Sequence, residues 1–193
     1  MRVIAGRFKG AALATAKPGT RPTTDRTKEA IFSRLDAWGV LDDARVLDLF
    51  AGTGALGIES LSRGARELVA VEAAAPAAAL IAKTLGELKR NRSWESDMSA
   101  RVIKAKAEKY VAAAAAKPFD AILIDPPYAF PTEDCNQLLT NLVEHGFAAD
   151  GALIMLERSA RSDEPAAPEG WEITERRDYG ETAVFYIERS RED

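Results

Sequence analysis

A glycine-rich turn between an apolar run and a helix is the first feature of the sequence that could bind a ligand. The turn has the spacing Gly52-x-Gly54-x-x-Gly57 and follows an apolar run that contains Asp48. Glycine permits positive φ angles and has no Cβ atom to block a close approach of the backbone, and the start of a helix offers unpaired N–H groups. With Glu72 at the end of the next apolar run, the spacing fits the dinucleotide-binding fingerprint. We therefore predict a nucleotide-like cofactor at this turn.

A second motif, Asp125-Pro126-Pro127-Tyr128, follows another apolar run. Two successive prolines make a stiff loop with few N–H donors, so its carbonyl groups remain available as acceptors, and Tyr128 adds a flat face. If the two apolar runs form neighbouring strands of an open sheet, both motifs face one crevice at the carboxyl ends of the strands. Acceptors beside a flat face suit an amino-bearing base, which we predict as the second ligand.

Strands and helices alternate from residue 45 onward, which predicts a mostly parallel sheet covered on both faces. We expect parallel strands at residues 45–50, 67–72, 100–105, 119–125 and 151–157. Helices are expected at residues 76–89, 107–116 and 132–145, in addition to the helix that starts at Ala55. Residues 171–177 and 182–188 alternate in polarity and predict an antiparallel pair at one edge of the sheet.

The N-terminal segment is more basic than the rest of the chain. Residues 1–34 hold eight Lys or Arg against Asp25 and Glu29, a net charge of +6 in a chain whose net charge is −4. Short apolar runs at residues 2–5 and 11–15 predict a small hairpin, and a helix capped by Thr24 or Asp25 is expected to end before Gly39. Because they cluster in the loop and helix start, Arg21, Arg26 and Lys28 are candidates for phosphate contacts; a solvated basic arm is the alternative.

Cysteine usage and hydropathy exclude several classes. Cys135 is the only cysteine, so the chain cannot form an internal disulfide or a Cys-cluster metal site. The apolar runs are too short to span a membrane, and the N-terminus lacks the apolar region of a signal peptide. We therefore expect a soluble, cytoplasmic protein that needs no metal and no membrane.

The two motifs together resemble the S-adenosylmethionine-dependent methyltransferases that modify exocyclic amino groups of nucleic-acid bases. Four further segments resemble the RsmD family, whose members methylate a guanine N2 in bacterial 16S ribosomal RNA: Arg2-Val-Ile-Ala-Gly, residues 19–26, residues 56–64, and Tyr179-Gly-Glu-Thr182. The resemblance covers nearly the whole chain. It implies an α/β protein with the Rossmann-like class I methyltransferase fold: a mostly parallel seven-stranded sheet with an antiparallel edge strand and a small N-terminal β-hairpin extension.

The resemblance also implies roles for particular residues. An N-terminal extension over residues 1–40 would contact RNA, and a domain over residues 41–193 would bind S-adenosylmethionine. The residues implied at the cofactor are Asp48, Phe50, Ala51, Gly52, Thr53, Gly54, Glu72, Ala107 and Asp125. The residues implied in catalysis are Asp125, Pro126, Pro127 and Tyr128, and those implied at the substrate are Arg21, Thr23, Arg26, Lys28 and Tyr179. The expected partner is 16S ribosomal RNA within an assembled small subunit or late precursor, bound by a monomer.

The chemistry of the residues agrees with these implied roles. S-adenosylmethionine carries positive charge and no phosphate, so Asp48 would attract it, whereas the same carboxylate would repel a pyrophosphate. Asp125 and the carbonyl of Pro126 would accept hydrogen bonds from the target amino group, and Tyr128 would stack on the base. Such a reaction needs alignment more than a strong base.

Three other functions remain open. The Asp125 motif alone permits methylation of adenine N6 in DNA. The glycine spacing permits an NAD-dependent oxidoreductase, and the basic N-terminus permits an RNA-binding factor without catalysis.

Overall fold

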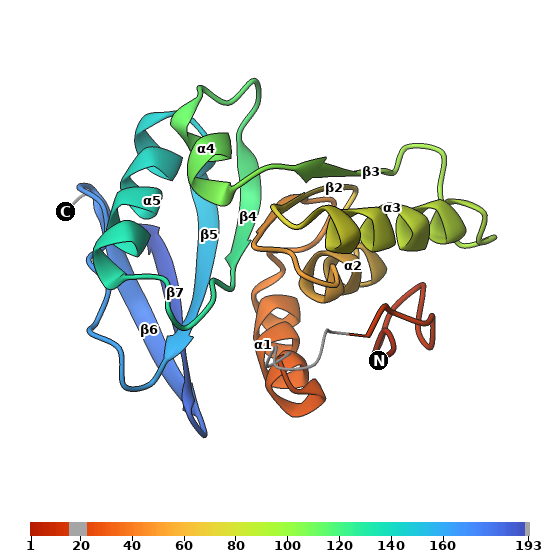
Figure 1. Cartoon of the computed structure of the whole chain (residues 1–193), viewed down its shortest axis with the longest axis horizontal. Coiled ribbons are helices and arrows are strands. Elements are labelled where there is room, and N and C mark those ends of the chain that lie inside the picture. Colours follow the sequence, from red (N-terminus) through yellow and green to blue (C-terminus); the bar gives the residue numbers. More distant parts are fainter. Residues whose placement is uncertain (16–22, 192–193) are drawn as a thin grey trace.

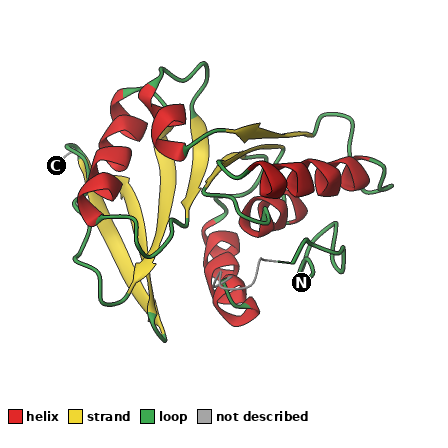
Figure 2. Cartoon of the chain, viewed as in Figure 1, coloured by secondary structure: helices red, strands yellow, loops and turns green. Residues whose placement is uncertain are grey.

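The computed structural model describes residues 1–15 and 23–191 of the chain. Its described part forms one seven-stranded sheet in the order β3-β2-β1-β4-β5-β7-β6, flanked by helices on both faces (Figures 1 and 2). The strands are β1 Arg45–Leu49, β2 Glu67–Glu72, β3 Ser99–Lys104, β4 Phe119–Ile124, β5 Ala148–Ser159, β6 Trp171–Tyr179 and β7 Thr182–Arg189. The helices are α1 Asp25–Trp38, α2 Ala55–Ser62, α3 Ala75–Lys89, α4 Ala107–Ala112 and α5 Thr132–Glu144.

The sheet topology confirms the expected class I arrangement. Strands β3, β2, β1, β4 and β5 are mutually parallel, and β1 lies between β2 and β4. Strand order therefore reverses between β1 and β4, which is where open α/β sheets bind ligands. At the other edge, β7 runs antiparallel to both β5 and β6, so the last two strands form the predicted antiparallel pair.

Alternation along the strands divides the core into two apolar layers. The layer under α1, α2 and α3 includes Val46 of β1, and the layer under α4 and α5 includes Leu47 and Leu49 of the same strand. Successive side chains of a strand point to opposite faces of the sheet. Consequently Asp48, which follows Leu47, lies on the α1–α3 side.

The N-terminal residues form a short antiparallel pairing and pack against α2. The N–H groups of Val3, Gly10 and Leu13 bond to the carbonyls of Ala11, Val3 and Met1, each at 2.9 Å. One antiparallel bridge joins Arg2 to Ala12. A Cβ atom on Gly6, whose φ is +90°, would lie 1.9 Å from the carbonyl oxygen of Ser62 at the end of α2. Such a close backbone approach requires glycine. In the same region Arg7 pairs with Glu95 at 3.1 Å, so the segment between α3 and β3 supports the N-terminal residues.

Helix α4 and strand β5 differ most in length from the prediction. Helix α4 ends at Ala112 instead of residue 116, because the N–H of Ala115 bonds to the carbonyl of His145 (2.9 Å) and the chain turns toward β4. Strand β5 begins at Ala148, three residues earlier than predicted, because Ala148 pairs with Phe119 before a register shift. In the described part of the chain, no helix combines the length and apolar character needed to cross a bilayer.

Candidate active site

Three carboxyl groups meet on one face of the sheet where parallel strands end. Asp48 lies in β1, Asp125 follows β4, and Glu157 lies near the end of β5. Because Ile124 and Leu156 are register partners, Asp125 and Glu157 come next to each other at the ends of neighbouring strands. Leu123 and Met155 belong to the α1–α3 layer. Because alternate residues of a strand point to the same face, Asp125 and Glu157, two residues further on, also lie on the α1–α3 side of the sheet.

The predicted glycine turn joins β1 to α2 by a tight path. Gly52 and Gly54 have φ angles of +58° and +79°, and Phe50 has a φ of +57° although it carries a side chain. A left-handed non-glycine residue costs on the order of 1–3 kcal/mol, and such residues cluster at ligand sites. A Cβ on Gly52 would meet no atom within 4 Å, so this part of the turn faces open space.

Asp48 supports the turn from beneath. Its side chain is 1% exposed, and its Oδ2 accepts the N–H of Gly57 at 3.0 Å. A Cβ on Gly57 would approach Leu68 to 2.6 Å, so glycine permits the close packing of α2 on β2. Burial raises the pKa of Asp48 to about 7, against the lowering effect of the Gly57 N–H, and the charges of Asp125 and Glu72 raise it further.

Glu72 links the end of β2 to the same turn. Its two carboxylate oxygens accept the N–H groups of Gly52 and Ala74, each at 2.9 Å. Each carboxylate oxygen has two lone pairs, so the group retains capacity for two further hydrogen bonds. A pair of ribose hydroxyl groups is a ligand of this kind.

Thr23, just before α1, contacts the carboxyl groups at the ends of β4 and β5. Its Oγ1 lies 3.2 Å from Asp125 Oδ2, and it lies 3.1 Å and 3.4 Å from the two carboxyl oxygens of Glu157. Burial raises the pKa of Asp125 to about 6, while hydrogen bonds with Glu157 and Thr23 lower it. Burial and the neighbouring charge of Asp125 raise the pKa of Glu157 well above its usual range.

Glu157 is the acid that our sequence analysis missed. It is 3% exposed and is the member of the carboxyl group that comes from β5. The available signal was its position: it is an acidic residue at the carboxyl end of an expected parallel strand, as Glu72 is.

The loop after β4 is held at several points. The carbonyl of Phe130 accepts Nη2 of the buried Arg158 at 2.7 Å, and the ring of Phe130 packs edge-on against Phe50 with centroids 5.1 Å apart. Tyr128 is 46% exposed, and its hydroxyl lies 3.3 Å from Thr182 Oγ1 at the β6–β7 turn. The side chain of Tyr128 is therefore partly accessible, and its hydroxyl is held by Thr182.

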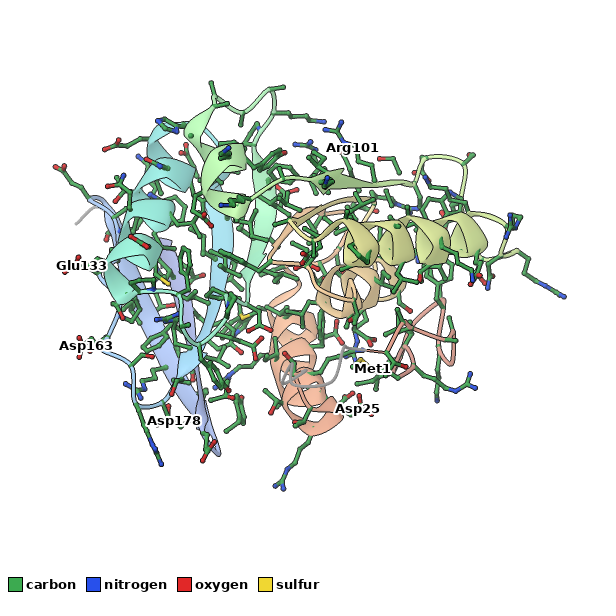
Figure 3. The ribbon with its side chains drawn as sticks, in the orientation of Figure 1. Met1, Asp25, Arg101, Glu133, Asp163 and Asp178 are labelled. Carbon is green, nitrogen blue, oxygen red and sulfur yellow. The ribbon has the colours of Figure 1, made fainter. Side chains whose placement is uncertain are left out.

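Ala107 and Tyr179 follow or end strands at opposite edges of the sheet, β3 and β6. Ala107 begins α4 after the end of β3 and is buried. Tyr179 ends β6 and lines a groove of about 420 Å³ together with Arg34, Ala37 and Arg177. The groove lies between α1 and the β6–β7 hairpin, and Figure 3 marks the tip of that hairpin with Asp178.

The expected phosphate contacts have different outcomes. Arg21 lies outside the described residues, and Arg26 is exposed in the first turn of α1. The prediction for Lys28 is wrong in this structure, because its side chain is fully buried and its Nζ lies 3.1 Å from Glu59 Oε1. Glu59 also accepts the N–H of Ile4 at 2.9 Å, so Lys28 belongs to the packing between α1, α2 and the N-terminal residues.

Comparison with known proteins gives a consistent result. The profile of a family described as "Conserved hypothetical protein 95" matches residues 1–188. The chain is 33% identical to ribosomal RNA small subunit methyltransferase D of Escherichia coli K12, over 98% of this chain and 90% of that protein. It is 32% identical to the protein of the same name from Haemophilus influenzae, over 93% and 89% of the two chains.

Solved structures agree with this relationship. The Escherichia coli protein yhhF superposes with a TM-score of 0.82 at 32% identity, covering 98% of this chain and 97% of that chain. Magnesium protoporphyrin IX methyltransferase of Synechocystis, solved with bound S-adenosylmethionine, shares the fold with a TM-score of 0.64 at 15% identity, covering 86% and 79% of the two chains. Because the family profile spans almost the whole chain and relatives share a third of its residues, the protein belongs to the RsmD family of methyltransferases.

Proposed function

We propose that the protein transfers a methyl group from S-adenosylmethionine to the exocyclic N2 amino group of a guanine in 16S ribosomal RNA. The observation that carries this proposal is the placement of two motifs on neighbouring strands. The glycine turn follows β1, the Asp125-Pro126-Pro127-Tyr128 loop follows β4, and the two strands pair directly. A methyl donor and an amino acceptor would therefore meet between them. The names of the relatives, which refer to small-subunit ribosomal RNA, support the choice of substrate.

The residues around the turn fit S-adenosylmethionine. Glu72 and Asp125 supply negative charge, Asp48 is a further carboxyl that a bound cation would ionise, and no described Lys or Arg side chain forms an ion pair with any of them. Such a site favours a cation and disfavours a pyrophosphate. The open side of Gly52 allows close approach, and Glu72 has spare acceptors for a ribose. When bound, S-adenosylmethionine supplies a methyl group activated by its positively charged sulfur.

The residues of the β4 loop would align the acceptor. Asp125 and the carbonyl of Pro126 would accept the two N–H groups of the target amine, which directs the nitrogen lone pair toward the methyl group. As the new N–C bond forms, the nitrogen becomes positively charged and must lose one proton. Asp125 would then be the nearest acceptor for that proton. Tyr128 would stack on the base, a contact worth about 1–3 kcal/mol in single-stranded systems.

Recognition of RNA would involve the N-terminal extension of residues 1–40. Arg26 is exposed where a phosphate could reach it, and Tyr179 lies beside the β6–β7 turn that contacts Tyr128. Arg21 stays a candidate of the same kind, whereas Thr23 would act through Asp125. The chain offers only a small basic surface of its own, so we propose that its substrate is an assembled small subunit or late precursor, which would supply further contacts. We also propose that the protein binds it as a monomer.

The direct test is product analysis. The protein is incubated with labelled S-adenosylmethionine and with small subunits from cells that lack the enzyme, and nucleosides are identified by mass spectrometry. We expect N2-methylguanine from the wild type and from Asp163→Asn, an exposed control outside the proposed site. Asp125→Asn should retain binding of S-adenosylhomocysteine and lose transfer.

Parallel reactions separate the alternatives. Naked 16S RNA tests whether the assembled particle is required. N6-methyladenine formed in DNA, without N2-methylguanine, would favour the DNA methyltransferase. Binding of NADH but not S-adenosylhomocysteine would favour the oxidoreductase, and binding of neither would favour the RNA-binding factor.

A further inference from the structure

The contacts of Thr23 constrain the protonation of the two carboxyl groups beside it. A hydroxyl group has one hydrogen to donate and two lone pairs that accept. Thr23 Oγ1 has Asp125 Oδ2 at 3.2 Å and Glu157 Oε2 at 3.1 Å. If both carboxyls were ionised, only one contact could be a hydrogen bond, and the other would place two acceptors together. If one carboxyl holds a proton, both contacts are satisfied.

Exposure decides which carboxyl holds the proton. Glu157 is 3% exposed, whereas Asp125 is partly exposed. Ionisation is disfavoured most where a group is least hydrated, and two adjacent carboxyls disfavour each other's ionisation. The proton therefore resides on Glu157, in agreement with the raised pKa of that group.

We propose that Glu157 is a positioning residue that works as a neutral acid: its O–H is shared between Asp125 and Thr23 Oγ1, the Thr23 hydroxyl donates to Asp125, and Asp125 stays ionised and oriented toward the target amine. This inference rests on the proposed function. It assigns work to a residue outside the Asp125-Pro126-Pro127-Tyr128 motif. Glu157 would neither touch the base nor accept its proton, because Asp125 and Thr23 lie between them.

The surroundings of Glu157 offer no competing role among the described residues. The titratable groups that face it are Asp125 after β4, Asp48 of β1 and Tyr186 of β7, with Thr23 covering it from the segment before α1. Tyr186 has a buried hydroxyl without a hydrogen-bond partner. Arg158, the next residue in β5, contributes to the loop on the opposite face through Phe130. Loss of the Glu157 proton at alkaline pH would place a second negative charge beside Asp125 and break the chain of hydrogen bonds.

The test compares Glu157→Gln with Glu157→Ala. Glutamine keeps the shape and has an N–H that can donate to Thr23, so it mimics the neutral acid. We expect Glu157→Ala to lower kcat on small subunits by about 10²-fold, the order of effect expected when reacting groups are misplaced by about 1 Å. We expect Glu157→Gln to recover most of that loss. Both variants should bind S-adenosylhomocysteine within about threefold of the wild type, which shows that they fold. Glu172→Gln, an exposed residue of the edge strand β6, is the matched control.

Two further readouts separate positioning from structural support. The wild-type rate should fall on the alkaline side as Glu157 ionises, and Glu157→Gln should lack that fall. Infrared spectroscopy at neutral pH should show the C=O stretch of a buried protonated carboxyl in an Asp48→Asn background, which removes the partly protonated Asp48, and Glu157→Gln in the same background should remove that band.

The outcomes distinguish this inference from the proposed function. A wild type without N2-methylguanine product would overturn both. An active wild type whose Glu157→Gln variant is as slow as Glu157→Ala would overturn the inference alone, because an ionised Glu157 would then be required. Absence of the protonated carboxyl band from the Asp48→Asn background would overturn it whatever the activity.

Discussion

The hydroxyl of Thr23 lies 3.2 Å from the carboxylate of Asp125, although 102 residues separate them in the sequence. Thr23, just before α1, thus takes part in the site at the end of β4. Since Asp125 is the residue proposed to hold the target amine, a group that orients Asp125 affects the rate of methyl transfer.

Thr23→Val removes the hydroxyl and keeps the shape of the side chain. A hydrogen bond contributes about 0.5–1.5 kcal/mol net, so we expect kcat to fall roughly two- to tenfold while S-adenosylhomocysteine affinity is retained. Thr23→Ser, which restores the hydroxyl, should recover the rate. Equal rates for the valine and serine variants in steady-state assays would contradict a role for the hydroxyl.

Gly6→Ala tests how the N-terminal residues pack on α2. The new Cβ would lie 1.9 Å from the Ser62 carbonyl at a φ of +90°, so backbone strain and overpacking add. We expect a loss of at least about 2 kcal/mol in the free energy of unfolding, measured with urea. Gly10→Ala is the control, because φ is +84° there and no atom lies within 4 Å of its Cβ. If both variants lose the same stability, the Ser62 contact is not limiting.

The parts of this fold that local pattern determines were predictable. Strands β1, β2 and β4 are apolar runs that end within a residue of their expected limits, because buried parallel strands are continuous and glycine or proline follows them. The contacts that complete the site were not predicted. Thr23 approaches Asp125 only through the packing of α1 on the sheet, and Glu157 approaches it through the pairing of β5 with β4. The burial of Lys28 had a local signal that was overlooked: with Ile31, Phe32 and Leu35 it follows the helical spacing of one buried face.

Arg26 and Lys28 should therefore affect RNA binding differently. Each phosphate contact in single-stranded RNA contributes about 0.7 to the slope of log K against log salt. Arg26→Gln should reduce the magnitude of that slope by roughly this amount, measured by titration of RNA at several salt concentrations. Lys28→Met should leave the slope unchanged and lower the free energy of unfolding, because Glu59 loses a buried partner. An unchanged slope in Arg26→Gln would exclude it as a phosphate contact.

Asp48 should make stability depend on pH. Its pKa is about 7 in the folded protein against 3.8 for the ordinary side chain, so between these values the folded state binds a proton that the unfolded state lacks. Stability then falls as pH rises through this window. Asp48→Asn should remove the part of the fall that Asp48 contributes, leaving the part due to Asp125 and Glu157, and should exceed the wild type at pH 8 by at most on the order of 4 kcal/mol, while the two converge near pH 4. Asp163→Asn, which is exposed, should follow the wild-type pH profile in urea titrations.

The same carboxyl groups should couple cofactor binding to protons. A positively charged ligand favours the ionised form of a carboxyl and lowers its pKa, so binding near pH 6.5 should release protons from Asp48 and Asp125, whose pKa values are about 7 and 6. S-adenosylhomocysteine lacks the sulfonium charge and should release fewer. Calorimetry in two buffers with different ionisation enthalpies measures the number of protons for each ligand, and Asp48→Asn should reduce the difference. Equal proton release by the two ligands would show that these carboxyls do not sense the charge that distinguishes the methyl donor from its product.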